Sequence, residues 1–193
     1  MRKILINIEK IPHYWILGIV LIYGLIMAEY YYTLSSKLVI GAANQLVNSS
    51  FFVFFMSFNF FLMVLSAFIV WIISSLLLHL ILILFGGESI FENFKKISAL
   101  CYIFPTISFI LSFLLLEQIE IYEDVNIDNF LTMNKIMIKI GWIINIGFIL
   151  YYLFLWLLLK YQTGLNWVRS LCVIIVPLGS IYLLGKLFSE YIL

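Results

Sequence analysis

Long apolar runs separated by short polar segments make up most of the chain. The longest uncharged stretch extends from Leu38 to Gly87 and contains no Asp, Glu, Lys or Arg. Roughly twenty apolar residues in a helix already cross the ~30 Å hydrocarbon layer of a bilayer. A run of this length is too long for an element of a soluble core, so the pattern predicts a membrane protein.

Five candidate spans follow from the apolar runs, at about 11–34, 51–85, 98–116, 140–159 and 170–187. Backbone groups in lipid must find their hydrogen-bond partners within the segment, and these runs are too long for barrel strands, so all five should be helices. We expect an all-α integral membrane protein whose 193 residues form a single domain with five transmembrane helices.

The second run is longer than a bilayer needs. At 1.5 Å per residue it reaches about 50 Å, so it must tilt, kink or project from the membrane. We expect projection at its N-terminal end, which carries five phenylalanines: Phe51, Phe52, Phe54, Phe55 and Phe58. A split into two short helices is the alternative, although no Pro or Gly interrupts the run.

Lys and Arg near the span ends predict the orientation, because these residues are enriched on the cytoplasmic side. If the chain crosses the membrane five times, the larger group of basic residues lies on the side of the N-terminus: Arg2, Lys3, Lys10, Lys95, Lys96, Lys160 and Arg169. The opposite side would hold Lys37, Lys135, Lys139 and Lys186. The N-terminus is therefore expected in the cytoplasm and the C-terminus outside, together with an acidic loop of Glu117, Glu120, Glu123, Asp124 and Asp128.

Composition excludes several classes of function. Hydrophobic residues make up 65% of the chain, charged residues only 11%, and the mean hydropathy is +1.14. No basic stripe could neutralise a run of phosphates, so we expect no nucleic-acid partner. Zinc-protease and serine-hydrolase motifs are missing, and two histidines in the whole chain cannot build a multi-histidine metal centre. We expect neither catalysis nor a cofactor.

Glycines and prolines mark the predicted interruptions. Gly86-Gly87 should end the second helix, because glycine adopts left-handed backbone angles at little cost. Ser89 and Glu92 have the spacing of a capping box that would start a short interfacial helix. Pro105 and Pro177 should each break a helical hydrogen-bond ladder.

Two blocks of the sequence resemble the prokaryotic Yip1-domain family. The first includes Gly86-Gly87-Glu88-Ser89 after a long apolar helix, followed by Tyr102 three residues before Pro105. The second contains Trp156, the turn Gly164-Leu165, and 169–177 with its proline. The resemblance implies a five-span membrane fold and carries no catalytic residues. The GTPase-binding signature of eukaryotic relatives has no match in this N-terminus.

Four polar residues fall inside the predicted spans: Glu29, Asn59, His79 and Asn145. Ionisable groups in a membrane are functional candidates, and amides there can join helices. They could line a transport route. The simpler interpretation is that Glu29 reaches the headgroups, His79 bonds a neighbouring carbonyl, and both asparagines stabilise helix packing.

The leading functional hypothesis is a non-enzymatic protein that assembles with other integral membrane proteins through Phe51–Phe58. It could be an accessory or protective subunit of a transporter, for example beside ABC-type transporter subunits. One alternative is a small transporter or channel. Another is an immunity protein whose acidic loop attracts a cationic, membrane-active peptide. Abundant Ile, Lys, Asn and Phe indicate an AT-rich bacterial source and hence the cell membrane.

Overall fold

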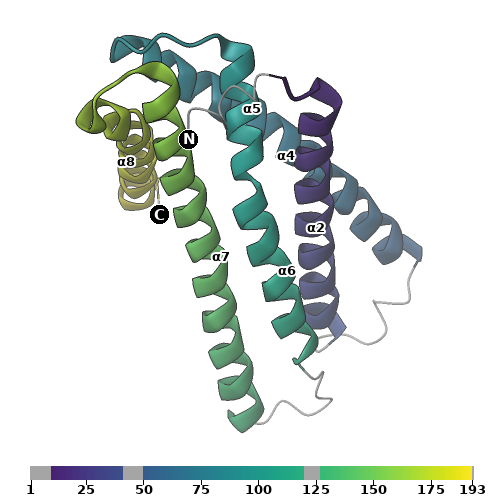
Figure 1. Ribbon diagram of the computed structural model, residues 1–193. Coiled ribbons are helices and arrows are strands. Elements are labelled where there is room, and N and C mark those ends of the chain that lie inside the picture. The colour runs from purple at the N-terminus through teal and green to yellow at the C-terminus, as the bar shows by residue number, and fades with distance from the viewer. Residues whose placement is uncertain (1–9, 41–49, 120–126, 193) are drawn as a thin grey trace. The chain divides into compact units, whose positions relative to one another are not determined.

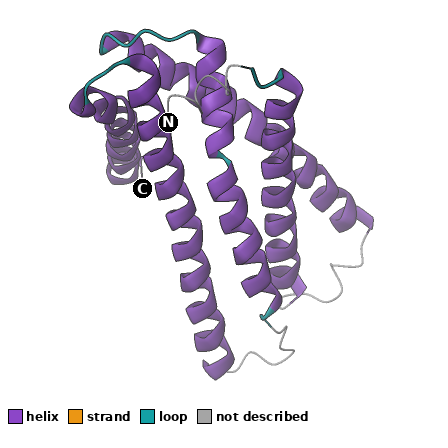
Figure 2. Cartoon of the chain, viewed as in Figure 1, coloured by secondary structure: helices purple, strands orange, loops and turns teal. Residues whose placement is uncertain are grey.

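A computed structural model describes residues 10–40, 50–119 and 127–192, and helices account for nearly all of them (Figures 1 and 2). In chain order they are α2 (His13–Ile40), α4 (Ser50–Leu84), α5 (Phe91–Cys101), α6 (Ile103–Glu117), α7 (Ile127–Thr163) and α8 (Trp167–Ile192). Within these described ranges there is no strand. The prediction of an all-α fold is confirmed.

Four helical stretches of the described chain are long and apolar enough to cross a bilayer. They are His13–Lys37, Ser50–Leu84, Phe91–Glu117 and Leu131–Thr163. The third stretch joins α5 and α6, so it begins earlier than the predicted span at 98–116. The expected fifth span falls in α8, whose apolar part, Trp167–Ser180, is shorter. The chain is therefore a multi-pass membrane protein.

Helix α4 is one uninterrupted helix of 35 residues. At 1.5 Å per residue it is about 50 Å long, against ~30 Å for the hydrocarbon layer. It does not split into two short helices. Nothing in its sequence between Ser50 and Leu84 interrupts the backbone ladder, because the stretch lacks both Pro and Gly.

The described residues fall into two compact units. The first unit contains the start of α2 up to Ile16, then 70–101, and the chain from Tyr152 onward. The second unit contains Leu17–Ile69 and Tyr102–Tyr151. Helices α2, α4 and α7 each contribute residues to both units.

In the second unit, α2 and α6 lie side by side and run in the same direction (Figure 1). Two ring contacts, seven residues or about two helical turns apart, join α2 to α6 and to Tyr102 directly before it. The rings of Tyr23 and Tyr102 are 4.6 Å apart, and those of Tyr30 and Phe109 are 5.3 Å apart. Because α4 crosses between α2 and α6 along the chain, two successive spans in a membrane would make α2 and α6 parallel.

Helices α4 and α7 of the second unit run antiparallel to these partners. A Cβ on Gly24 of α2 would lie 3.1 Å from the Cβ of Ala67 on α4, while Tyr32 meets Phe60 further along. Gly147 of α7 similarly lies against Ser108 of α6. Small residues let the backbones of membrane helices approach closely. Both glycines are therefore at interhelical contacts.

Lys37 joins the last turn of α2 to the C-terminal end of α6. Its Nζ donates to the carbonyl oxygens of Leu116 at 2.8 Å, Ile119 at 2.9 Å and Glu117 at 3.4 Å. The last carbonyls of a helix have no intrahelical donor and carry partial negative charge. A cation at this point satisfies them, so Lys37 caps α6 from a neighbouring helix.

In the first unit, the end of α4 packs antiparallel to α5 through hydroxyl groups. Trp71 Nε1 donates to Ser98 Oγ at 3.1 Å, and the hydroxyls of Ser75 and Ser98 are 2.7 Å apart. Ser75 and Ser98 are fully buried. Because each of these buried hydroxyls has a partner, this polar contact joins the two helices without leaving an unsatisfied group.

The turn between α7 and α8 is built from an aromatic pair and a cap. Gly164 has φ +66°, and Asn166 Oδ1 accepts from the Arg169 amide at 2.8 Å, which caps the start of α8. Trp156 Nε1 donates to Ser170 Oγ at 3.1 Å, across the turn. The Nζ of Lys160 lies over the Trp167 ring, a cation–π contact.

The two internal prolines have different effects. Pro105 lacks the amide that would bond the Cys101 carbonyl, and the helix is interrupted at Tyr102, between α5 and α6. The Tyr102 carbonyl instead accepts from both the amide and the hydroxyl of Thr106. Pro177 differs from the expectation, because α8 continues through it without a break.

Candidate functional site

The end of α4 is a glycine turn that positions the following loop. The Gly86 amide bonds the Ile83 carbonyl at 2.9 Å, and the Gly87 amide bonds the Leu82 carbonyl at 3.0 Å. With Gly86 at φ +79°, these two bonds form a Schellman motif. A Cβ on Gly87 would lie 2.7 Å from Leu82 Cδ1, so the chain folds back closely over the last turn of α4.

Helix α5 starts differently from the prediction. It begins at Phe91, and the Ser89 hydroxyl donates to the Ile90 carbonyl at 3.3 Å. Within the described residues Ser89 therefore makes no bond to Glu92, and the expected capping box is absent. The Ile90 carbonyl accepts from the amides of Asn93 and Phe94. This places Ile90 at the cap position and leaves Ser89 facing the space beside the turn.

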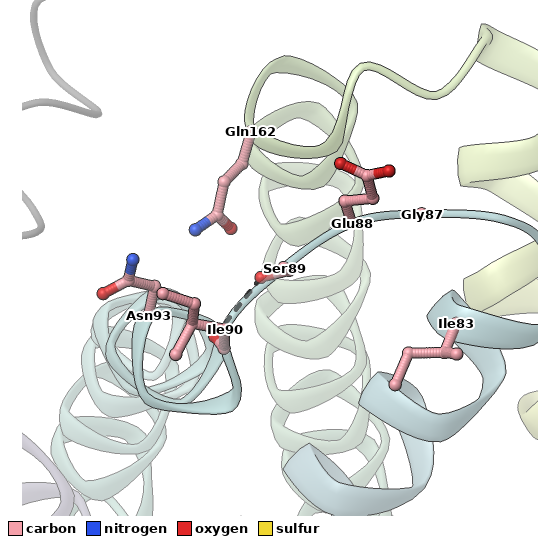
Figure 3. A pocket seen from close by; sticks show the side chains of 7 residues that line it. All are labelled: Ile83, Gly87, Glu88, Ser89, Ile90, Asn93 and Gln162. Atoms are coloured by element: carbon pink, nitrogen blue, oxygen red, sulfur yellow. Dashed lines mark hydrogen bonds between the residues drawn. The ribbon is translucent and has the colours of Figure 1, made fainter.

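A pocket of about 540 Å³ opens beside this turn (Figure 3). Its lining comes from the last turn of α4, the connecting loop, the start of α5 and the last turn of α7. The lining residues are Ile83, Gly87, Glu88, Ser89, Ile90, Asn93 and Gln162. All of them belong to the first unit. The pocket combines apolar side chains with carboxylate, hydroxyl and amide groups.

Glu88 and Gln162 both line this pocket, and their oxygen atoms differ in accessibility. Gln162 Oε1 is a buried oxygen with no hydrogen-bond partner in the described structure. The Glu88 side chain is exposed, and it forms no ion pair with any described residue. A buried amide oxygen without a donor loses hydration with no compensation, typically about 1–3 kcal/mol.

His79 lies one helical turn from Ser75 and is 8% exposed. Its ring contacts two aromatic rings of α5, with centroids 5.3 Å from Phe91 and 5.6 Å from Phe94. Its Nδ1 is buried without a hydrogen-bond partner in the described chain, so the expected bond to a neighbouring carbonyl is not formed there. Aromatic packing holds the ring in place.

The other three predicted polar residues belong to the second unit, and His79 belongs to the first. Glu29 and Asn145 are exposed, and Asn59 is half-buried. No hydrogen bond or ion pair joins any of the three to another described residue.

The first turns of α4 carry five phenylalanines. Phe51, Phe54, Phe55 and Phe58 are 77%, 68%, 55% and 52% exposed, and Phe52 is half-buried. Phe54 and Phe58 stack with centroids 6.4 Å apart and an interplanar angle of 11°. One end of α4 therefore carries a large aromatic surface that contacts little else in the described chain.

Two further predictions concern charged and metal-binding groups. Glu120, Glu123 and Asp124 of the acidic loop lie outside the described residues. Within the part of the chain that the structure describes, no three His, Cys, Asp or Glu residues gather as metal ligands. Cys101 is buried and Cys172 is half-buried, and both are free thiols.

Sequence reasoning missed Gln162 and Lys37 as residues of interest. Gln162 follows an apolar run near a helix end, where a polar residue is common. Lys37 was used only to predict the orientation of the spans. The proximity of Gln162 to Thr163-Gly164 signalled a helix end, but no local pattern relates it to Glu88.

No family model, curated protein or solved structure matches the chain. The resemblance to the Yip1-domain family stays a prediction.

Proposed function

We propose that this protein is a non-enzymatic, multi-pass protein of the bacterial cell membrane that works by associating with other integral membrane proteins. In this proposal α8 supplies a fifth span, the N-terminus is cytoplasmic and the C-terminus is outside. The alternating directions of α2, α4, α6 and α7 support successive crossings, and the Lys and Arg distribution supports the orientation. Membership of the prokaryotic Yip1-domain family is part of the proposal.

The exposed phenylalanines of α4 are the observation that carries this function. Phe51, Phe54, Phe55 and Phe58 are all more than half exposed. The helix exceeds the hydrocarbon thickness by about 20 Å, so part of it lies beyond the lipid tails or tilts strongly within them. Aromatic side chains supply large contact areas at interfaces and are enriched among energetically important residues. Another integral membrane protein, such as an ABC-type transporter subunit, is the partner we propose.

The test combines photo-crosslinking with purification from the native membrane. A benzophenone amino acid replaces Phe54 in one variant, and Ile73 in a matched control on the same helix. Ile73 is also exposed, at 52%, but lies in the other unit. After irradiation, the tagged chain is purified in mild detergent and analysed by mass spectrometry.

We expect a second membrane protein in stoichiometric yield, crosslinked from position 54 and not from position 73. Replacing Phe54 and Phe58 together by alanine should then reduce its recovery. Recovery of this chain alone, with crosslinks only to lipid from both positions, would overturn the proposal.

A further inference from the structure

Each of the four apolar spans has one end at the same end of the first unit. His13, where the first span starts, lies 3.9 Å from Glu92 in the first turn of α5 (Nε2 to Oε2). The end of α4, the start of α5 and the end of α7 line one pocket with Ile83, Asn93 and Gln162 (Figure 3). Because a span ends where lipid tails give way to headgroups, this end of the unit lies at headgroup level.

Basic side chains outnumber acidic ones at this end. Five basic residues lie close to these helix ends, against the two carboxylates of Glu88 and Glu92, which leaves an excess of three positive charges. The basic residues are Lys10, Lys95, Lys96, Lys160 and Arg169. Apart from the buried Lys96, they form no ion pair with any described residue. The surface is therefore positively charged and is not neutralised within the described chain.

The turn between α7 and α8 fixes one of these cations without neutralising it. Lys160 Nζ lies 3.0 Å from the centroid of the Trp167 ring and 5.3 Å from that of Tyr161. Trp167 in turn packs edge-on against Trp156, with centroids 5.0 Å apart. A cation over an aromatic face keeps its charge and its N–H donors. The contact also brings Lys160 to the first turn of α8, which carries the exposed Arg169.

Aromatic and apolar side chains at the same end indicate a lipid surface as the partner. Tyr14 and Trp15 in the first turn of α2 are exposed, as is Trp167 in the first turn of α8. Amphipathic rings of this kind are enriched at the headgroup level of a bilayer. Leu84 and Ile90 are exposed beside them, where acyl chains would cover them. A soluble polyanion would match the charge but leave these apolar side chains in water.

We propose that this end of the first unit binds anionic phospholipid headgroups and so enriches negatively charged lipid around the protein. Lys160 and Arg169 supply charge on either side of Trp167, and Lys10 and Lys95 add to the positive potential. The proposal requires only that the chain cross a membrane. It does not depend on the partner contact through Phe51–Phe58, which belongs to the second unit.

The test measures which lipids the purified full chain retains. The tagged protein is equilibrated with mixed micelles of phosphatidylglycerol and phosphatidylcholine, in equal amounts and with identical acyl chains, and then washed. The retained lipids are quantified by mass spectrometry. The test variant combines Lys160→Gln with Arg169→Gln. The matched control combines Lys135→Gln with Lys139→Gln, which removes the same charge from two exposed positions of α7 in the second unit.

We expect the wild type to retain phosphatidylglycerol about tenfold over phosphatidylcholine. A basic residue near an anionic membrane surface contributes about fivefold, and the two carboxylates offset part of the total. The test variant should lower the preference below about threefold, and the control should keep it. Raising the salt from about 0.1 M to about 1 M shortens the Debye length from ~10 Å to ~3 Å, so most of the wild-type preference should disappear.

Equal retention of both lipids by the wild type would overturn the proposal, and so would an equal loss of preference in the two double variants. A thermal unfolding curve verifies that each variant keeps the fold. Lys160→Arg preserves the charge over Trp167 and should preserve the preference. If the double variant does not fold, Arg169→Gln alone, at an exposed position, decides the matter: it should lower the preference, and an unchanged value would contradict the proposal.

Discussion

Replacement of Lys37 by methionine should loosen the second unit at one defined place. Methionine keeps most of the aliphatic stem and removes the amino group. The three carbonyls that Lys37 reaches, on Leu116, Glu117 and Ile119, then lose their donor. These carbonyls belong to the C-terminal end of α6, where a helix needs external donors.

The expected loss follows from the geometry of these bonds. Two of them, at 2.8 and 2.9 Å, have good lengths, and the third, at 3.4 Å, is weak. A hydrogen bond to a charged group contributes roughly 1.5–3 kcal/mol when buried, and a cation at a helix C-terminus about 0.3–2 kcal/mol. Because Lys37 is only half-buried and water can replace part of the contact, we expect a net loss of about 2 kcal/mol.

Thermal unfolding in detergent measures the global effect. A loss of this size should lower Tm by about 4–8 °C for a chain of this length. Lys37→Arg keeps the charge and should restore part of the difference. Hydrogen exchange gives the local effect, because the amides of Gln118 and Ile119 should exchange faster when the end of α6 frays.

Lys139→Met is the matched control, since Lys139 is exposed and contacts no charged partner in the described chain. It should leave Tm and exchange unchanged. Equal Tm values for Lys37→Met, Lys139→Met and the wild type would refute the capping role.

Three further substitutions test local packing. Gly147→Leu should prevent the close approach of α6 and α7 and strongly reduce the yield of folded protein, because a Cβ at this position already collides with Ser108. Gly141→Leu is the control: a Cβ there meets no atom within 4 Å, so this variant should express normally. Gly86→Ala should cost about 1–2 kcal/mol, read as a lower Tm, since its φ of +79° is unfavourable for a side chain; an unchanged Tm would count against the turn geometry. His79→Leu should keep or raise Tm, because it removes a buried nitrogen that has no partner in the described chain. A fall of several degrees would show that the ring contacts with Phe91 and Phe94 stabilise the fold by more than the unpaired nitrogen costs.

The helical class and the main interruptions could be derived from local patterns. Helical hydrogen bonds join residues four apart, so a long apolar run without Pro or Gly predicts one helix, as in α4. The missing amide of Pro105 and the left-handed φ of Gly86 also affect only backbone hydrogen bonds within a few residues, so both interruptions could be predicted locally. The start of α5 was harder, because Ser89 and Ile90 are both sterically acceptable cap positions and the serine hydroxyl bonds the Ile90 carbonyl instead.

Contacts between helices depended on the tertiary structure. Lys37 bonds carbonyls 79 or more residues away along the sequence, and this requires the parallel register of α2 and α6. Gln162 meets the pocket of Glu88 only because the end of α7 lies beside the turn after α4. The hydropathy of a helix indicates how much of its surface is removed from water. It does not indicate which face contacts which neighbouring helix, since lipid and protein interior are equally apolar. Side-chain shape and helix register decide that choice, and both are properties of the packed chain.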